Sequence, residues 1–98
     1  MSADITLNSS AGSFPPAGHY SHSTTASGFV FISGQLPVTF DGEKKADASF
    51  EDQTRLVLQN IDACLAGAGV SRQHLVSVRV YVTDMNQWPT FNKIYGEW

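Results

Sequence analysis

The pattern of apolar and polar positions is clearest in His74–Thr83, which reads HLVSVRVYVT. Valine stands at every second position from Val76 to Val82, and the residues between the valines are polar or amphipathic. Successive side chains of a strand point to opposite faces, so this alternation predicts a strand whose valines pack under a helix. Its other face, with Arg79 and Tyr81, would meet water in a monomer or another subunit in an oligomer.

Two further segments have the pattern of strands joined in a hairpin. His19–Ala26 is rich in Tyr, Ser and Thr, and Phe29–Leu36 begins with a run of apolar residues. Ser27-Gly28 supplies a two-residue turn between them, because glycine tolerates a positive φ. We therefore expect a β-hairpin whose second strand is the more buried one.

A long helix is predicted to begin after Ser49. The Ser49 side chain is a good N-cap, and Asp52 three residues later gives a weak form of the capping box. Gly67 and Gly69 can end the helix, because glycine adopts left-handed geometry easily. The i, i+3, i+4, i+7 spacing of one helix face is followed by Phe50, Thr54, Val57, Leu58, Ile61, Leu65 and Ala68.

A second helix is predicted near the end of the sequence. Asp84 or Asn86 can cap it, and Pro89 is tolerated in its first turn. One face of this helix would be aromatic, with Trp88, Phe91, Tyr95 and Trp98. No glycine or proline ends this helix, and its last residue, Trp98, is a large aromatic that favours burial. We therefore expect the natural chain to continue beyond it.

Composition indicates one small globular domain spanning residues 1–98. The chain is 42% hydrophobic and 15% charged. Met1–Gly18 is small and polar and is broken by Pro15-Pro16, so we expect an irregular arm over the surface. Between the segments described above, no repeat or linker separates a second domain.

Charge and cysteine usage narrow the function classes. The net charge is −3 and the longest basic run is Lys44-Lys45, so a nucleic-acid partner is disfavoured. A single cysteine, Cys64, allows no intrachain disulfide and suits a reducing compartment. The first ten residues lack the pattern of a signal peptide, and no apolar run approaches about 20 residues. We therefore expect a soluble cytoplasmic protein without a membrane partner.

Several residues that could carry chemistry have simpler interpretations. His19 and His22 form an HxxH pattern, but residues three apart on a strand point to opposite faces, so we expect no metal site. Cys64 stands on the apolar face of the first helix, where a free cysteine usually packs as a small hydrophobic residue. Arg79 could hold a carboxylate or could pair with a surface acid, and the sequence favours neither.

The apolar run from Phe29 stops at Ser33-Gly34-Gln35, which raises the question of what this strand end does. Gly34 could mark a bulge, or its missing side chain could let a ligand contact the backbone. Asn92 lies at the edge of the second helix's apolar face, where an amide must find partners. It could tether the Ser33-Gly34 backbone or bind a ligand.

Four quoted stretches together resemble the Rid family, also called the YjgF family. They are GHYSH at Gly18–His22, VFISGQLPV at Val30–Val38, QNIDACLAGAGV at Gln59–Val70, and Val78–Trp98. The resemblance implies an α+β fold of the chorismate-mutase-like (YjgF) type, with a mixed sheet and two helices on one face. It also implies a homotrimer with ligand pockets between subunits, where the polar face of the valine strand would line the centre.

The same resemblance implies hydrolysis of 2-imino acids to 2-keto acids and ammonia, without a cofactor. Tyr20, Ser33, Gly34 and Asn92 would be substrate-binding residues. The family's carboxylate-binding arginine and catalytic glutamate lie beyond the second helix, with two further strands, and residues 1–98 contain neither. We therefore assign no catalytic residue within this sequence and leave open whether residues 1–98 are catalytically active.

Two other functions remain as alternatives. The first is a non-catalytic Rid-like module that binds a small carboxylate or a protein partner at the same interface. The second is a ribonuclease, which an acidic chain without a basic groove fits poorly.

Overall fold

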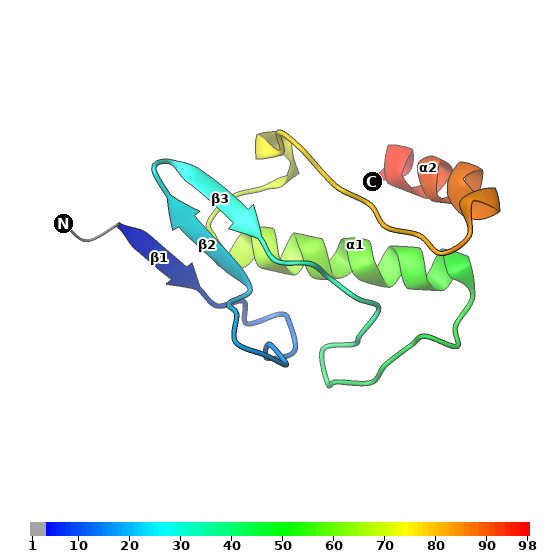
Figure 1. The fold of residues 1–98 in the computed structure, drawn as a ribbon, viewed down its shortest axis with the longest axis horizontal. Coiled ribbons are helices and arrows are strands. Elements are labelled where there is room, and N and C mark those ends of the chain that lie inside the picture. The colour runs from blue at the N-terminus through cyan, green and yellow to red at the C-terminus, as the bar shows by residue number, and fades with distance from the viewer. Residues whose placement is uncertain (1–3) are drawn as a thin grey trace.

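A computed structural model describes residues 4–98 (Figure 1). Its sheet has three antiparallel strands in the order β1 (Ile5–Asn8), β2 (Ser23–Ala26) and β3 (Phe29–Ile32). Ser27 and Gly28 both have positive φ, 52° and 81°, in the two-residue turn between β2 and β3. This left-handed turn matches the twist of a hairpin, and it confirms the predicted hairpin with shorter strands. The expected burial is wrong: β2 is buried or half-buried throughout, whereas Phe29 and Phe31 of β3 are exposed.

Strand β1 corrects the expected irregular arm. Ile5 pairs with Ala26 and Asn8 with Ser23, so the start of the described chain is a sheet edge. The Asn8 side chain also donates to Thr25 Oγ1 at 2.9 Å. Apolar Ile5 and Leu7 alternate with polar residues, but the alternation spans only four residues and small polar residues follow it, so the segment was expected to be irregular. Met1–Ala3 of the expected arm lie outside the described residues.

The outer face of the sheet is apolar and exposed. The register places Ile5 in one row with Phe29, and Leu7 in the next row with Phe31, so all four side chains share a face. Each of them is more than half exposed. The opposite face is the one covered by α1 (Phe50–Gly67), which contacts β2 and β3.

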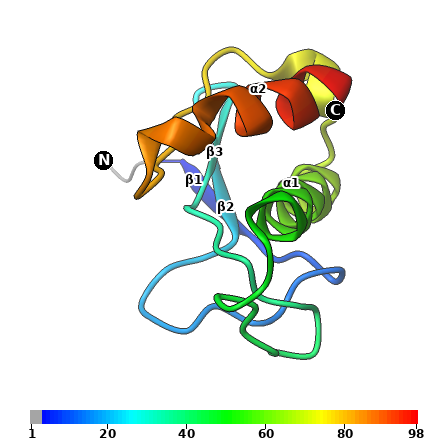
Figure 2. The same ribbon diagram turned by 90° about the vertical axis from the view of Figure 1, so that its right-hand side faces the viewer.

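Helix α1 has the predicted ends. The Ser49 side chain accepts a hydrogen bond from the Asp52 N–H at 3.1 Å, and Gly69 has a φ of 77° just past the C-terminus. In the second view, α1 is seen almost end-on beside the sheet, and α2 (Trp88–Glu97) packs against it (Figure 2). The buried hydrophobic residues of the described chain are few: Leu58, Cys64, Leu65, Phe91 and Ile94.

Polar side chains add contacts that this small core lacks. The buried Asn60 amide on α1 donates to the carbonyl of Leu36 at 3.0 Å and to that of Val38 at 2.9 Å. About one turn further along α1, Ser10 Oγ donates to the Ala63 carbonyl at 2.6 Å. The loops before and after the hairpin are thus both bound to α1.

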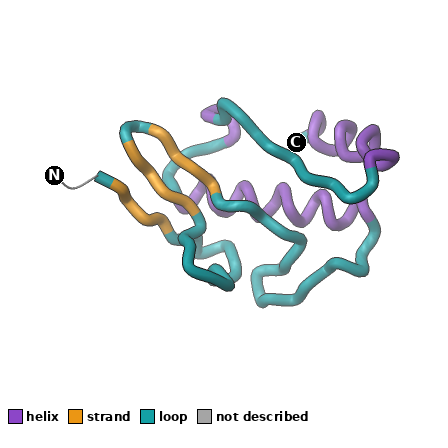
Figure 3. The backbone as a smooth tube through the Cα atoms, in the orientation of Figure 1, coloured by secondary structure: helices purple, strands orange, loops and turns teal. Residues whose placement is uncertain are grey.

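The strand predicted for His74–Thr83 is wrong for the described structure. Its first residue ends a short 3-10 helix, Arg72–His74, and the rest is a connection without regular structure (Figure 3). Val76 is 90% exposed and Val78 45%, so the valines are not all buried under a helix. A strand requires a neighbour for its backbone N–H and C=O groups, and none of the three described strands pairs with this segment. The described sheet is accordingly antiparallel rather than mixed.

Helix α2 follows the prediction closely. A 3-10 turn, Met85–Gln87, leads into it, with Asp84 Oδ1 accepting from the Asn86 N–H at 3.0 Å. Pro89 lies in its first turn. The aromatic face is a continuous series of stacked rings with centroids 5.2 to 5.8 Å apart: Trp88, Phe91, Tyr95 and Trp98.

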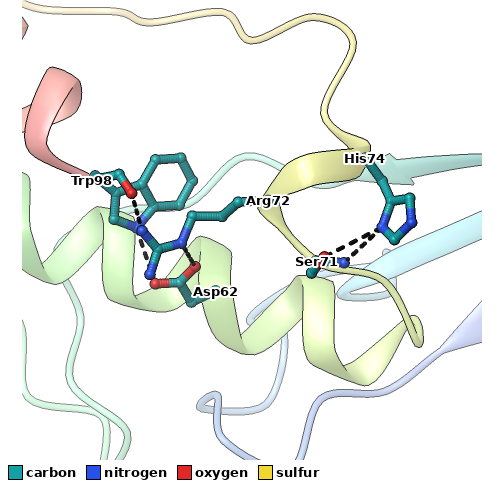
Figure 4. A network of polar contacts seen from close by, with 5 residues as sticks. All are labelled: Asp62, Ser71, Arg72, His74 and Trp98. Atoms are coloured by element: carbon teal, nitrogen blue, oxygen red, sulfur yellow. Dashed lines mark hydrogen bonds and ion pairs between the residues drawn. The ribbon is translucent and has the colours of Figure 1, made fainter.

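The end of α2 is held by a polar network (Figure 4). Asp62 on α1 accepts from Arg72 Nε at 2.8 Å and from Trp98 Nε1 at 3.0 Å. The Arg72 guanidinium also lies 4.8 Å from the Trp98 ring centre and donates to the Trp98 carbonyl oxygen. These contacts join α1, the Arg72–His74 turn and α2; nearby, Ser71 N–H donates to His74 Nδ1 at 3.1 Å.

Gly67 allows α1 to approach the loop after β1. An added Cβ there would lie 2.7 Å from the Ser9 carbonyl oxygen and 2.9 Å from Ser10 Cα. We expect Gly67→Ala to lower the free energy of unfolding by about 1–3 kcal/mol, because backbone atoms must move. Gly96→Ala on α2 is the matched control: its Cβ meets nothing within 4 Å, so we expect no loss and a gain of up to about 1 kcal/mol. Urea unfolding of both variants measures this, and equal midpoint shifts would contradict it.

Asn60 and Asn92 form a second matched pair. Asn60→Asp replaces the amide donor by an acceptor facing two carbonyl oxygens. We expect it to lower the free energy of unfolding by at least about 2 kcal/mol. Asn92 is exposed, so Asn92→Asp should change the free energy of unfolding by less than about 0.5 kcal/mol. A large loss in the Asn92 variant, or none in the Asn60 variant, would show that the tether is assigned to the wrong amide.

Candidate ligand site at the end of strand β3

Ser33 follows β3 directly and is held by several hydrogen bonds. Its N–H donates to the His22 carbonyl at 3.1 Å, and its Oγ donates to the Ser21 carbonyl at 2.6 Å. Its own carbonyl accepts from Gln35 Nε2 at 3.0 Å. The hydroxyl proton is therefore committed, so Ser33 Oγ can interact with a further group only as an acceptor, through its lone pairs.

Gly34 is exposed and lies outside the sheet ladder, which ends at Ile32. An added Cβ would meet nothing within 4 Å, so the space beside it is open. A ladder bulge at this position is thus not what the structure shows. The open backbone is compatible with a small molecule approaching it.

Tyr20 lies beside this group along the chain, next to Ser21. Its ring is 51% exposed, and its hydroxyl oxygen accepts from the Ala17 N–H at 3.4 Å, a long hydrogen bond. Tyr20, Ser33 and Gly34 thus belong to one end of the hairpin. All of them face solvent at least partly, so one chain does not enclose them.

Asn92 is not part of this group. It is exposed on α2, and no hydrogen bond among residues 4–98 joins it to Ser33 or Gly34. The amide that tethers the segment after Ser33-Gly34-Gln35 is Asn60 instead. The sequence held a signal for it: Asn60 is four residues before the buried Cys64, so its amide is on the covered side of the helix and requires partners.

The two histidines of the HxxH pattern are separated in the structure. His19 is exposed, whereas His22 is only 7% exposed. His22 Nδ1 accepts from the Ser10 N–H at 2.9 Å, and Nε2 lies 2.8 Å from the Phe14 carbonyl oxygen. Within the described range, no group of three or more His, Cys, Asp or Glu side chains is arranged to hold a metal ion.

Cys64 is fully buried on α1, beside Ser13 Oγ at 3.9 Å. Burial raises the pKa of the Cys64 thiol, and the Ser13 contact opposes this only in part. A neutral, enclosed thiol is a poor nucleophile, and the position fits a small packing residue. Arg79 is exposed and takes part in none of the ion pairs found in the described chain.

A hollow of about 440 Å³ lies elsewhere, between α1 and α2. It is lined by Glu51, Arg55, Pro89, Thr90, Lys93, Ile94 and Glu97. Acidic and basic side chains are mixed along it, and none of the expected ligand-binding residues borders it.

No helix within residues 4–98 combines the length and the apolar character needed to cross a membrane.

Comparison with known proteins identifies relatives over most of the chain. A RutC family protein of Pyrococcus horikoshii is 40% identical over 85% of this chain and 66% of its own length. The putative reactive intermediate deaminase TdcF of Escherichia coli is 37% identical over 82% of this chain and 61% of its own. The chain thus spans less than two thirds of these curated relatives.

Solved structures share the fold. Yeast Mmf1 matches with a TM-score of 0.89 and 32% identity, over 95% of this chain and 74% of that one. E. coli TdcF with bound serine matches with a TM-score of 0.86 and 31% identity, over 94% and 72%. The E. coli YjgF gene product gives 0.86 and 25% over the same shares. The α+β fold of the YjgF type is thereby confirmed.

A family model described as endoribonuclease L-PSP matches residues 11–98, almost the whole described chain. Together with the RutC and TdcF relatives and the YjgF-type fold, this match shows that the chain belongs to the Rid (YjgF) family.

Proposed function

We propose that the protein hydrolyses reactive 2-imino acids, such as 2-iminobutanoate and 2-iminopropanoate, to 2-keto acids and ammonia. The observation that carries the proposal is its similarity to E. coli TdcF, a reactive intermediate deaminase by name whose structure was solved with serine bound. Serine carries a carboxylate and a nitrogen on the neighbouring carbon, as a 2-imino acid does. No cofactor enters the proposal.

The hairpin end supplies part of such a site. Gly34 offers open backbone, Ser33 Oγ retains a lone pair, and Tyr20 provides an aromatic ring with a hydroxyl group. A planar imine could lie against these groups. The family resemblance places the arginine that binds the carboxylate bidentately, and the glutamate that moves protons through water, after the second helix. Residues 1–98 therefore supply the pocket wall and not the charged groups.

The wall is open in one chain, and this supports a site completed by a neighbouring subunit. We propose a cytoplasmic homotrimer in which the apolar outer face of the sheet is covered. Ile5, Leu7, Phe29 and Phe31 are each more than half exposed on one face of the sheet, and an apolar patch of this kind often marks an interaction surface. Asn92 makes no hydrogen bond with Ser33 within the described chain. It would therefore contribute to a pocket only through a neighbouring subunit of such an assembly.

The deaminase proposal is tested by generating a 2-imino acid in the assay with an amino-acid oxidase. Semicarbazide is added to compete for the imine, and semicarbazone formation is followed with and without the protein expressed from its native gene. We expect the protein to lower the initial rate of semicarbazone formation, because the 2-keto acid released by hydrolysis reacts with semicarbazide more slowly than the imine does. An initial rate equal to that in buffer would exclude imine hydrolysis.

A binding module is the second candidate, favoured by the open backbone at Gly34 and by the serine bound in E. coli TdcF, since both support binding of a small carboxylate without requiring turnover. Calorimetric titration with 2-ketobutyrate separates the two functions, because a module binds the keto acid without accelerating hydrolysis. The net charge of −3 gives no electrostatic support for RNA as substrate, so we do not propose a nuclease.

Assembly is tested with Phe31→Asp, whose charge would stand on the apolar outer face. We expect the wild type to sediment with the mass of three chains and the variant to dissociate, because a buried carboxylate without a partner is costly. Phe40→Asp is the matched control: Phe40 is similarly exposed, at 66%, but lies in a loop outside the sheet. A monomeric wild type, or equal dissociation of both variants, would contradict the proposed interface.

A further inference from the structure

His22 is a buried residue that connects the hairpin to the loop that precedes it. It stands just before β2, where the chain passes the Ser10–Gly18 loop (Figure 1). Both ring nitrogens contact that loop: Nδ1 contacts the Ser10 N–H and Nε2 the Phe14 carbonyl. One imidazole thus holds the two ends of a turn of the loop.

These contacts fix the protonation state of the ring. A backbone N–H can only donate, so Nδ1 must be the acceptor. A backbone carbonyl can only accept, so Nε2 must carry the proton. The arrangement is therefore satisfied by the neutral ring with its proton on Nε2. A second proton on Nδ1 would face the Ser10 N–H, donor against donor.

The His22 ring has no charged partner among residues 4–98. Residues 9–18 contain no titratable side chain, and neither do β2 and β3. On its own loop, His22 is accompanied by His19 and Tyr20, which are exposed. From α1, the nearest titratable group in the same polar network is the Cys64 thiol, reached through Ser13 and Ser10. No carboxylate accepts from either ring nitrogen.

We propose that His22 is a proton-sensitive switch that releases the Ser10–Gly18 loop and loosens the support of Ser33 when the pH falls. Loss of the Nδ1 contact leaves the Ser10 backbone N–H without its acceptor, and Ser10 Oγ is the group that binds the loop to the Ala63 carbonyl on α1. On the other side, the His22 and Ser21 carbonyls are the acceptors that hold Ser33. The effect on ligand binding rests on the proposed site, whereas the switch itself does not.

The sign follows from the tautomer. The neutral ring makes both contacts, so the order of the loop is present at higher pH and is lost as the pH falls. The protein would thus lose loop order in an acidic environment while α1 and α2, which contact each other directly, stay packed.

The test is the exchange of the Ser10 amide proton, measured by NMR on the intact protein and corrected for the intrinsic effect of pH. We expect its protection factor to fall at least about tenfold from pH 7.5 to pH 5, since a buried donor loses its acceptor. Protection of the Thr54 and Leu58 amides within α1 should change much less. Equal protection of Ser10 at both pH values would overturn the proposal, whatever the deaminase assay gives.

Variants identify the responsible histidine. His22→Gln provides an amide oxygen and an amide N–H without titrating in this range, so we expect the pH dependence to vanish. His19→Gln, three residues away and exposed, is the matched control and should keep it. His22→Gln could abolish protection at both pH values, and a measurement on the wild type then tests the proposal. The ¹⁵N chemical shifts of the His22 ring must show the Nε2–H tautomer at pH 7.5. The other tautomer, or a pH dependence that follows His19, would overturn the proposal.

Discussion

The arrangement of this chain depends on hydrogen bonds from α1 to the loops on both sides of the hairpin. Few hydrophobic side chains are fully buried, so apolar packing alone gives the loops little orientation. Asn60 fixes the segment after the hairpin, and the Ala63 carbonyl fixes Ser10 before it. The candidate residues at the end of β3 lie between these two anchors, so their position follows from α1.

Elements with local signals were predictable from the sequence. The Ser49 cap, the glycines after α1 and the Ser27-Gly28 turn each act through contacts within a few residues. The resemblance to the Rid family predicted the fold class and indicated a ligand site at the end of β3. The Ser33-Gly34 segment does lie at a strand end with open space beside Gly34, although its role in binding stays a prediction.

Elements that depend on distant partners were not predictable in the same way. The alternation in His74–Thr83 marks residues that suit a strand, but a strand forms only where a neighbour offers its backbone groups. Strand β1 shows the converse, because a pattern of only four residues forms a strand where the edge of β2 is available. The sequence analysis chose Asn92 and not Asn60 as the tethering amide, because both lie at the margin of an apolar helix face. Only the course of the loops, which brings two carbonyl groups to Asn60, distinguishes the two amides.

The free edge of β3 has a consequence for how the chain behaves in concentrated solution. In the described sheet β3 pairs only with β2, so its outer backbone groups are open beside the aromatic rings of Phe29 and Phe31. Such an edge is a template for any extended segment, including one from another molecule, and it favours aggregation when nothing covers it. Because Phe29 and Phe31 belong both to this edge strand and to the proposed subunit interface, the contacts that assemble the protein in an ordered way would also shield the edge from aggregation.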